Sequence, residues 1–291
     1  MTLKIAKKPQ KNILKIEKNK TKKEKGKKEM KTITIANQKG GVGKTTTSQA
    51  MLEGFKRKGF KVLGIDTDPQ SNLSSLLHYQ DNGKTIFNVL QKEPILDCII
   101  HTEEEIDLIQ GDFRISTIDQ SFTQINKHYL LKEAIDPIKK NYDFIIIDTA
   151  PTMNTMTMNA FTCSDSVLIP MFADLFSIQG LAQLFNTIQA IQVYTNPNLK
   201  IDGMLINQFQ VNTKVNQKLS NELAKISEEQ QIPIYQTKIR QGTAIRQQQV
   251  EQESIFDSNS NVARDFEIFI EEYLRKEKQK QSEKIETLDS E

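Results

Sequence analysis

The stretch from Asn37 to Thr46 most constrains the fold of this 291-residue chain. It reads Asn-Gln-Lys-Gly-Gly-Val-Gly-Lys-Thr-Thr and follows an apolar run at residues 32–36. Glycines let backbone N–H groups approach phosphate oxygens, and a helix that begins beside them adds its positive end. The stretch therefore predicts a strand, a phosphate-binding loop and a helix from Lys44, with Lys44 at the β- and γ-phosphates and the Thr45 hydroxyl at Mg²⁺.

The loop contains one lysine more than phosphate binding requires. The usual pattern G-x-x-x-x-G-K-[ST] needs glycine at position 38, where this chain has Gln38 followed by Lys39. The sequence is a deviant form, K-G-G-x-G-K-[ST]. Lys44 accounts for an ordinary phosphate loop, so Lys39 needs a separate explanation.

Short apolar runs alternate with amphipathic stretches after Lys31, which is typical of βαβ units. Two runs, at 61–65 and 144–147, are apolar at consecutive positions and precede Asp66 and Asp148, as expected for central strands that end at a ligand-binding edge. We predict an α/β fold with a doubly wound, mostly parallel twisted sheet flanked by helices, a P-loop NTPase of the deviant loop class. The predicted strands are 32–36, 61–65, 106–109, 144–147, 167–169, 201–206 and a weak one near 234; the predicted helices begin at 44 and include parts of 120–139, 177–193, 214–230 and 262–277.

Charge divides the chain into three segments. Residues 1–31 hold thirteen lysines and three glutamates, a net charge of +10, so the remainder carries −8 within a total of +2. Residues 1–30 have too few apolar side chains to offset the entropy of ordering and predict a disordered basic arm, either a solubilising tail or a contact for DNA. We predict one domain over 31–275 and a polar tail over 276–291.

Composition excludes several classes of protein. No run of about 18 apolar residues could span a bilayer, and no apolar stretch near the first residue resembles a signal peptide, so we expect an intracellular protein without a membrane partner. Cys98 and Cys163 have neither CxxC spacing nor histidine partners, so we expect buried thiols and no metal cluster.

Three motifs resemble those of the ParA/MinD family of P-loop ATPases. They are Lys39–Thr46, Asp66-Thr-Asp-Pro-Gln70 and Ile146-Ile-Asp-Thr-Ala-Pro151, in the family's order and spacing. Ala36-Asn-Gln-Lys39 and Asp68-Pro-Gln-Ser-Asn72 resemble the ParA branch, the DNA-partition ATPases. The resemblance implies ATP and Mg²⁺ as cofactors and a weak intrinsic ATPase activity.

The resemblance also implies roles for individual residues. Lys39 would cross a dimer interface to the phosphates of the other subunit's nucleotide, and with Lys44 and Asp68 it would be catalytic, Asp68 activating the attacking water. Asp66, Asp148 and Thr45 would lie at the metal, although a turn carboxylate is an alternative for Asp66. The nucleotide-binding set is Lys39, Gly40, Gly41, Val42, Gly43, Lys44, Thr45, Thr46 and Asn207. Thr46 would bind the α-phosphate, and Asn207 would read the adenine unless it only forms a turn.

Relatives of this kind bind DNA without sequence preference through basic residues late in the chain. Here the candidates are Lys214, Lys218, Lys238, Arg240 and Arg246. The resemblance implies an ATP-bound homodimer, stimulation by a ParB-like centromere-binding protein, and a cytoplasmic, nucleoid-associated place in a bacterium or archaeon.

Two other functions remain open. One is a MinD-like ATPase that positions another cargo, at a membrane or on the nucleoid. It would need an amphipathic terminal helix, yet the stripe Phe266, Phe269, Ile270, Tyr273 and Leu274 is better interpreted as core packing. The other is a DNA-binding scaffold that binds ATP without useful turnover, which Asp68 argues against.

Overall fold

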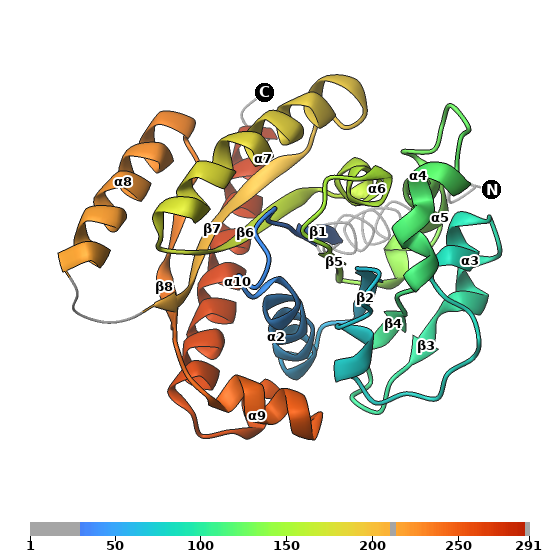
Figure 1. Ribbon diagram of the computed structural model, residues 1–291, viewed down its shortest axis with the longest axis horizontal. Helices are drawn as coiled ribbons and strands as arrows, with labels where there is room; N and C mark the ends of the chain where they lie inside the picture. Colours follow the sequence, from blue (N-terminus) through green and yellow to red (C-terminus); the bar gives the residue numbers. More distant parts are fainter. Residues whose placement is uncertain (1–29, 210–213, 289–291) are drawn as a thin grey trace, which may run out of the picture.

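The chain forms one sheet of eight strands in the order β3-β4-β2-β5-β1-β6-β7-β8 (Figure 1). A computed structural model describes residues 30–209 and 214–288. Every neighbouring pair of strands is parallel except β3 and β4, which are antiparallel. The bounds are β1 Lys31–Ile35, β2 Val62–Thr67, β3 Ile100–His101, β4 Asp107–Ile109, β5 Phe144–Thr149, β6 Ser166–Phe172, β7 Lys200–Phe209 and β8 Ile234–Arg240. The predicted doubly wound α/β class is confirmed.

Alternate residues of the central strands enter two different cores. In β1 and β5, Ile33, Ile35 and Ile146 pack in one core, whereas Ile145 and Ile147 pack in another. All six residues of β5 are buried, as the apolar run predicted. Asp148 shares the parity of Ile146, so its side chain faces the same side as the first of these cores.

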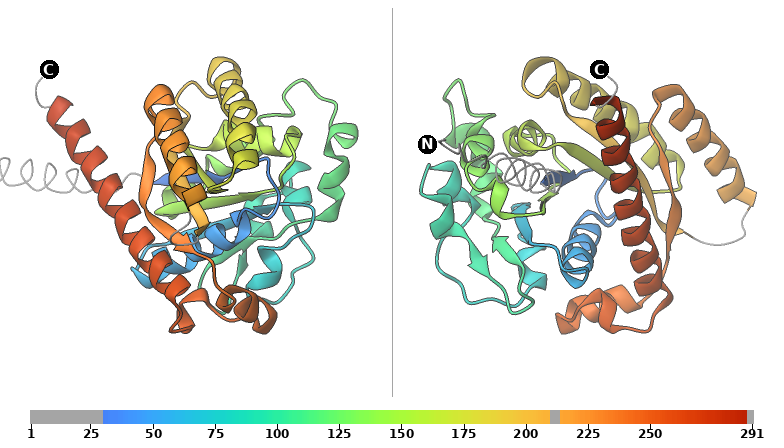
Figure 2. Two further views of the ribbon diagram at one scale, coloured as in Figure 1. Left: turned by 60° about the vertical axis from the view of Figure 1, so that its left-hand side comes forward. Right: turned by 180° about the vertical axis from the view of Figure 1, so that it is seen from behind.

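Helices cover both faces of the sheet (Figures 1 and 2). The first face carries α2 (Lys44–Arg57), α9 (Ala244–Glu251) and α10 (Asn261–Leu288), which pack with β1, β5 and β8. The second face carries α3 (Ile86–Leu90), α4 (Ile118–Ser121), α5 (Leu130–Ile135), α6 (Thr155–Cys163), α7 (Leu175–Tyr194) and α8 (Lys214–Gln230). Short 3-10 turns lie at Ser74–Leu76, Ile95–Cys98, Phe113–Thr117, Lys139–Asn141 and Ile255–Asp257.

The predicted strands and the helix start at Lys44 are confirmed, and three differences have physical causes. β3 was missed because it is only two residues long. The 120–139 stretch forms the two short helices α4 and α5 with a loop between them. We expected the last helix to fray after Arg275, but α10 continues to Leu288, because Lys276 pairs with Glu272 and Lys280 pairs with Glu277 and Asp202.

The apolar stripe of α10 is part of the core. Phe266, Phe269, Ile270 and Tyr273 are at most 1% exposed and pack with α2 and β8. Within the described residues, no helix is both long and apolar enough to cross a bilayer. Cys98 and Cys163 are buried free thiols, as predicted, whereas the basic arm over 1–29 lies outside the described residues.

Candidate functional site

The predicted site residues meet at the carboxyl edge of the parallel strands, where open α/β sheets bind ligands. A cavity of about 930 Å³ opens there, a volume in the range of ligand pockets. The phosphate loop after β1, the loop after β2 and the ends of β7 and β8 line it. Its walls include Gly40, Gly41, Gly43, Lys44, Thr45, Thr46, Asp68, Asn72, Asn207, Phe209, Ile239, Arg240, Gly242, Thr243, Ile245 and Phe266.

The phosphate loop is held open by its own backbone and by two asparagines. Gly41 and Gly43 have φ of 73° and 89°, a left-handed conformation that glycine adopts without strain. A Cβ on Gly43 would lie 2.6 Å from Nδ2 of Asn207, so only glycine fits there. Asn37 fixes the start of the loop, since its Nδ2 donates to Pro170 O at 2.8 Å and its Oδ1 accepts from Lys39 N at 2.9 Å. The backbone N–H groups are thereby preorganised for an anion.

Lys44 is a buried ammonium group in need of an anion. It is 6% exposed, and its Nζ donates to Lys39 O at 3.1 Å inside the loop. Burial lowers the pKa of Lys44, an effect that nearby Asp148 and Asp68 partly offset. Among the described residues no carboxylate lies within ion-pair distance of Lys44, and a phosphate in the cavity would supply the missing negative charge.

Lys39 occupies a different environment. Its Nζ lies 2.6 Å from Asp174 Oδ2 and 3.2 Å from Ser177 Oγ, and 5.2 Å from the centre of the Phe172 ring. Asp174 also caps α7 by accepting from Ser177 N. Burial alone would raise the pKa of Asp174, but the Lys39 ammonium and the Ser177 donors hold it below its usual value. Lys39 therefore pairs with the residue that caps α7, and it is not among the described residues that line the cavity.

Asp148 lies beside the phosphate loop with two hydroxyl partners. Thr45 Oγ1 donates to Asp148 Oδ2 and Ser48 Oγ donates to Asp148 Oδ1, both at 2.8 Å. Burial and the neighbouring Asp66 carboxylate raise the pKa of Asp148. Mg²⁺ is held in proteins by one or two carboxylates together with substrate phosphates and water. Thr45 and Asp148 are placed to hold such an ion once phosphates fill the loop, and the described residues contain no ready-made cluster of three metal ligands.

Asp66 and Asp68 differ although one residue separates them. Asp66 is fully buried, and it accepts hydrogen bonds from Asp68 N, Ser74 N and Ser74 Oγ. Burial raises the pKa of Asp66. Asp68 lines the cavity and accepts from Gln70 N at 2.9 Å. Asp68 is thus the one of the two that lines the cavity, whereas both carboxylate oxygens of Asp66 accept hydrogen bonds from its own loop.

Asn207 lines the cavity and has one side-chain acceptor without a hydrogen-bond partner. Its Nδ2 donates to Val42 O at 2.8 Å, while its buried Oδ1 has no hydrogen-bond partner. A buried acceptor without a partner is costly, and a ligand N–H would satisfy it. The amino group of adenine is a donor of this kind. The turn-forming alternative is disfavoured, because Asn207 lies within β7.

The structure describes the side chains of two of the five predicted DNA contacts, Lys238 and Arg240. Arg240 Nη2 and Nε lie 2.7 Å and 2.8 Å from the Asp265 carboxylate, and Arg240 lines the nucleotide cavity. Lys238 Nζ lies 4.4 Å from the centre of the Phe209 ring at the same end of the sheet. Arg240 is therefore bound within the molecule. The side chains of Lys214, Lys218 and Arg246 lie outside the described residues.

Sequence reasoning missed three polar residues of the site: Asn37, Ser48 and Ser74. Ser48 lies one helical turn after Lys44, so its i+4 spacing could have placed it beside the loop. Asn37 and Ser74 each also have a partner far away in the sequence, Pro170 and Gly111, and no local pattern indicates those two contacts.

The fold and the loop define a P-loop NTPase with a second lysine in its phosphate loop. The family model described as AAA domain (AAA_31) matches residues 30–201, more than half of the chain. The sporulation initiation inhibitor protein Soj of Bacillus subtilis is 36% identical over 200 residues, which cover 67% of this chain and 79% of Soj. The chain therefore belongs to the ParA/Soj family, as its motifs indicated.

Solved structures resemble it over most of its length. A plasmid partition protein from Borrelia burgdorferi bound to AMPPNP is 27% identical with a TM-score of 0.72, and the match covers 85% of this chain and 99% of that one. Cobyrinic acid a,c-diamide synthase from Mycobacterium smegmatis, with bound ADP and magnesium, is 25% identical with a TM-score of 0.73, over 86% and 96% of the two chains.

Proposed function

We propose that the protein is a partition ATPase that binds ATP and Mg²⁺ in the cavity above the phosphate loop. The observation that carries this is the contrast between the two loop lysines: Lys44 is buried in the cavity wall and forms no ion pair among the described residues, whereas Lys39 pairs with Asp174. Lys44 and the loop N–H groups bind the β- and γ-phosphates. Thr45 and Asp148 hold Mg²⁺, Thr46 contacts the α-phosphate, and Asn207 Oδ1 accepts from the adenine amino group.

ATP closes two subunits face to face, with Lys39 of each reaching the phosphates of the other. Two triphosphates at one interface concentrate negative charge, which the two lysines neutralise only while the γ-phosphate is present. Asp68 orients the attacking water. Intrinsic hydrolysis is slow, because the phosphate loop contains no arginine to stabilise the transition state.

The ATP-bound dimer binds DNA non-specifically, with Lys214, Lys218, Lys238, Arg246 and the basic arm as candidate contacts. A ParB-like DNA-binding partner stimulates hydrolysis, the dimer opens, and repeated cycles move or space a plasmid or chromosome in a bacterial or archaeal cell. The name of one similar solved structure supports partition, since it is a plasmid partition protein. The alternative, a MinD-like ATPase that cycles on a membrane, is less well supported, because the apolar stripe of α10 packs in the core and does not face outward to bind a bilayer.

Separate substitutions of the two lysines test this function. Lys44→Ala should weaken ATP binding roughly 10- to 150-fold, the effect of losing hydrogen bonds to a charged group. Lys39→Ala should change ATP binding less than about threefold, but it should abolish ATP-dependent dimerisation, measured by light scattering, and turnover. Lys56→Ala is the control, because Lys56 pairs with exposed Glu105 far from the loop. An equal loss of ATP binding in both loop variants would contradict the contact of Lys39 with the other subunit's nucleotide. If the wild type hydrolysed no ATP in the presence of DNA and the partner protein, the proposed ATPase activity would be wrong.

A further inference from the structure

The loop over residues 68–74, which carries Asp68, separates two cavities. Asp68 and Asn72 line the nucleotide cavity, whereas Pro69 and Ser71 line a second groove of about 470 Å³. The far wall of that groove is the segment 111–114, which follows β4. The loop therefore has open space on both sides, and its position is set by the buried Leu73 side chain and by polar contacts at its ends.

One end of the loop is tied to the other through Asp66. Asp66 Oδ1 accepts from Asp68 N at 3.1 Å, and Asp66 Oδ2 accepts from Ser74 N at 2.9 Å and Ser74 Oγ at 2.7 Å. Asp66 is fully buried and Ser74 is 2% exposed. The Ser74 hydroxyl thus closes the loop between residues 68 and 74 with its single proton.

The same hydroxyl joins the loop to the neighbouring strand. Ser74 Oγ accepts from Gly111 N at 2.9 Å, just after β4. A Cβ on Gly111 would lie 2.5 Å from Ser71 Oγ and 3.0 Å from Ser71 Cα. Any side chain at position 111 must displace the backbone of the loop that carries Asp68.

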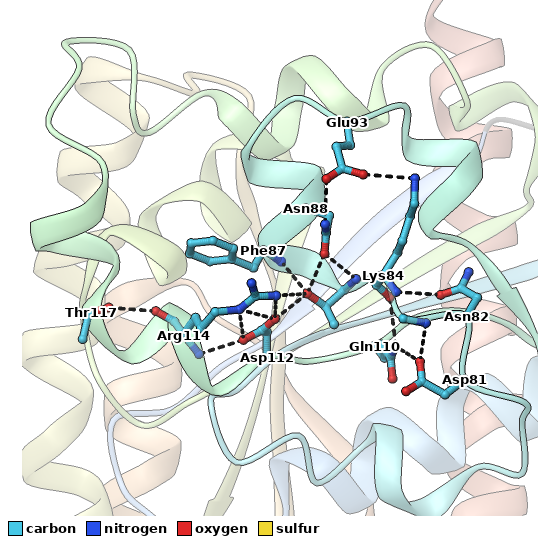
Figure 3. Close-up of polar contacts among 12 residues, drawn as sticks. Asp81, Asn82, Lys84, Phe87, Asn88, Glu93, Gln110, Asp112, Arg114 and Thr117 are labelled. Carbon is cyan, nitrogen blue, oxygen red and sulfur yellow. Dashed lines mark hydrogen bonds and ion pairs between the residues drawn. The ribbon is translucent and has the colours of Figure 1, made fainter.

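Gly111 is followed in the chain by Asp112, whose contacts with Arg114 are drawn in Figure 3. Asp112, next in the chain, accepts from Thr85 Oγ1 and, at 2.5 Å, from Arg114 Nη2, and the Arg114 guanidinium lies 4.4 Å from the Phe87 ring centre. Thr85 caps α3 and Asp112 caps the turn at Phe113–Thr117. Thr85 and Arg114 therefore hold Asp112 in place beside Gly111. The hydrogen bond from Gly111 N to Ser74 Oγ connects this segment to the loop that carries Asp68.

We propose that Ser74 and Gly111 are positioning residues that set Asp68 for hydrolysis. This rests on the proposed ATPase function. In that step the water oxygen bonds to the γ-phosphorus, the bond to the β-phosphate oxygen breaks with its electron pair on ADP, and the water proton ends on the released phosphate. Asp68 orients the water, and Ser74 and Gly111 act only through Asp68. Misplacement by about 1 Å is enough to cost on the order of 100-fold in rate.

Ser74→Ala should lower kcat by 10- to 100-fold while the Kd for ATP changes less than about twofold. The control is Ser75→Ala in the same 3-10 turn: Ser75 is exposed and donates only to Ser71 O, so its kcat should change less than about twofold. Unchanged kcat in Ser74→Ala would overturn the proposal. A parallel loss of ATP affinity would also overturn it, because the hydroxyl would then maintain the whole site.

Gly111→Ala tests the same positioning without removing a hydrogen-bonding group, and it decides the matter if Ser74→Ala does not fold. It should lower kcat with unchanged ATP affinity, as Ser74→Ala does. Gly180→Ala is the matched control, since a Cβ there meets nothing within 4 Å. Equal kcat in the two glycine variants would overturn the proposal. If the wild type itself never hydrolyses ATP with DNA and partner, the proposed function fails instead, which separates the two results.

Discussion

Buried carboxylates lie at both ends of the sheet, but only one end supplies them with cations. Asp202, near the start of β7, is 2% exposed and pairs with two lysines. Asp66 and Asp148, near the ends of β2 and β5, are fully buried, and neither forms an ion pair among the described residues. The chain thus neutralises its buried carboxylates with its own lysines at the first end and not at the second.

At the first end, the charges are satisfied by the chain itself. Lys31 Nζ lies 2.8 Å from both oxygens of Asp202, Lys280 Nζ lies 3.1 Å away, and the hydroxyls of Ser166 and Tyr273 also donate to it. Burial alone would raise the pKa of Asp202, but the two lysines hold it below its usual value. This cluster joins β1, β7 and α10, so its role is structural.

At the other end, in the described part of the chain, the two acids accept hydrogen bonds from hydroxyls and backbone N–H groups and form no ion pair, and burial raises the pKa of both. Asp66 and Asp148 are register partners on adjacent strands, so their charges repel. Perturbed acids of this kind are concentrated at functional sites. A metal ion and phosphates would complete this end as lysines complete the other.

The largest expected effect is on stability at the paired end. Asp202→Asn should lower the free energy of unfolding by about 3 kcal/mol, because it breaks the pair between buried Asp202 and half-buried Lys31, which then keeps Glu277 as its carboxylate partner. Urea unfolding measures this. Lys280→Ala is the control: its side chain is 51% exposed, so its contact with the same carboxylate should contribute less than about 1 kcal/mol. Similar losses in the two variants would show that exposure does not set the strength of this cluster.

The second prediction has the opposite sign. Asp148→Asn should raise the free energy of unfolding of the nucleotide-free protein by about 2 kcal/mol, because it removes a buried charge that forms no ion pair among the described residues. ATP with Mg²⁺ should stabilise the folded wild type more than ATP alone, and the variant should lose this additional stabilisation. Thermal unfolding with and without Mg²⁺-ATP measures both effects. A nucleotide-free protein less stable than the wild type would mean that the two ends of the sheet do not differ as described.

The sequence predicts one of these two ends far better than the other. Apolar runs that end in aspartate, together with the glycine loop, locate Asp66, Asp148 and Lys44, because each signal lies within about ten residues. Nothing local indicates that Lys31 meets Asp202 across 171 residues, or that Lys39 meets Asp174 across 135. The same limit explains the underestimated length of α10, whose Lys280 is held by Asp202 on β7. Contacts that only the assembled fold creates carry no periodic signature.

The smallest effect concerns Glu53 on α2, an acid intermediate between the two ends. It is 5% exposed and accepts from Ser254 Oγ, Ile255 N and Gln49 Nε2, and burial outweighs these neutral donors and raises its pKa to about 6. The folded state thus favours the protonated form. Stability from this group is full below the unfolded pKa of 4.5 and is lost as the pH rises through about 6, a decline of about 2 kcal/mol. Because the side chain in Glu53→Gln stays neutral, the variant should have a free energy of unfolding about 1 kcal/mol higher than the wild type at pH 8, measured by urea denaturation. The difference in free energy should be smaller at pH 5. Glu105→Gln is the control. Lys56 lowers the pKa of exposed Glu105, so this carboxylate stays charged between pH 5 and pH 8. An advantage that is the same at both pH values would mean that the Glu53 charge is not what destabilises α2.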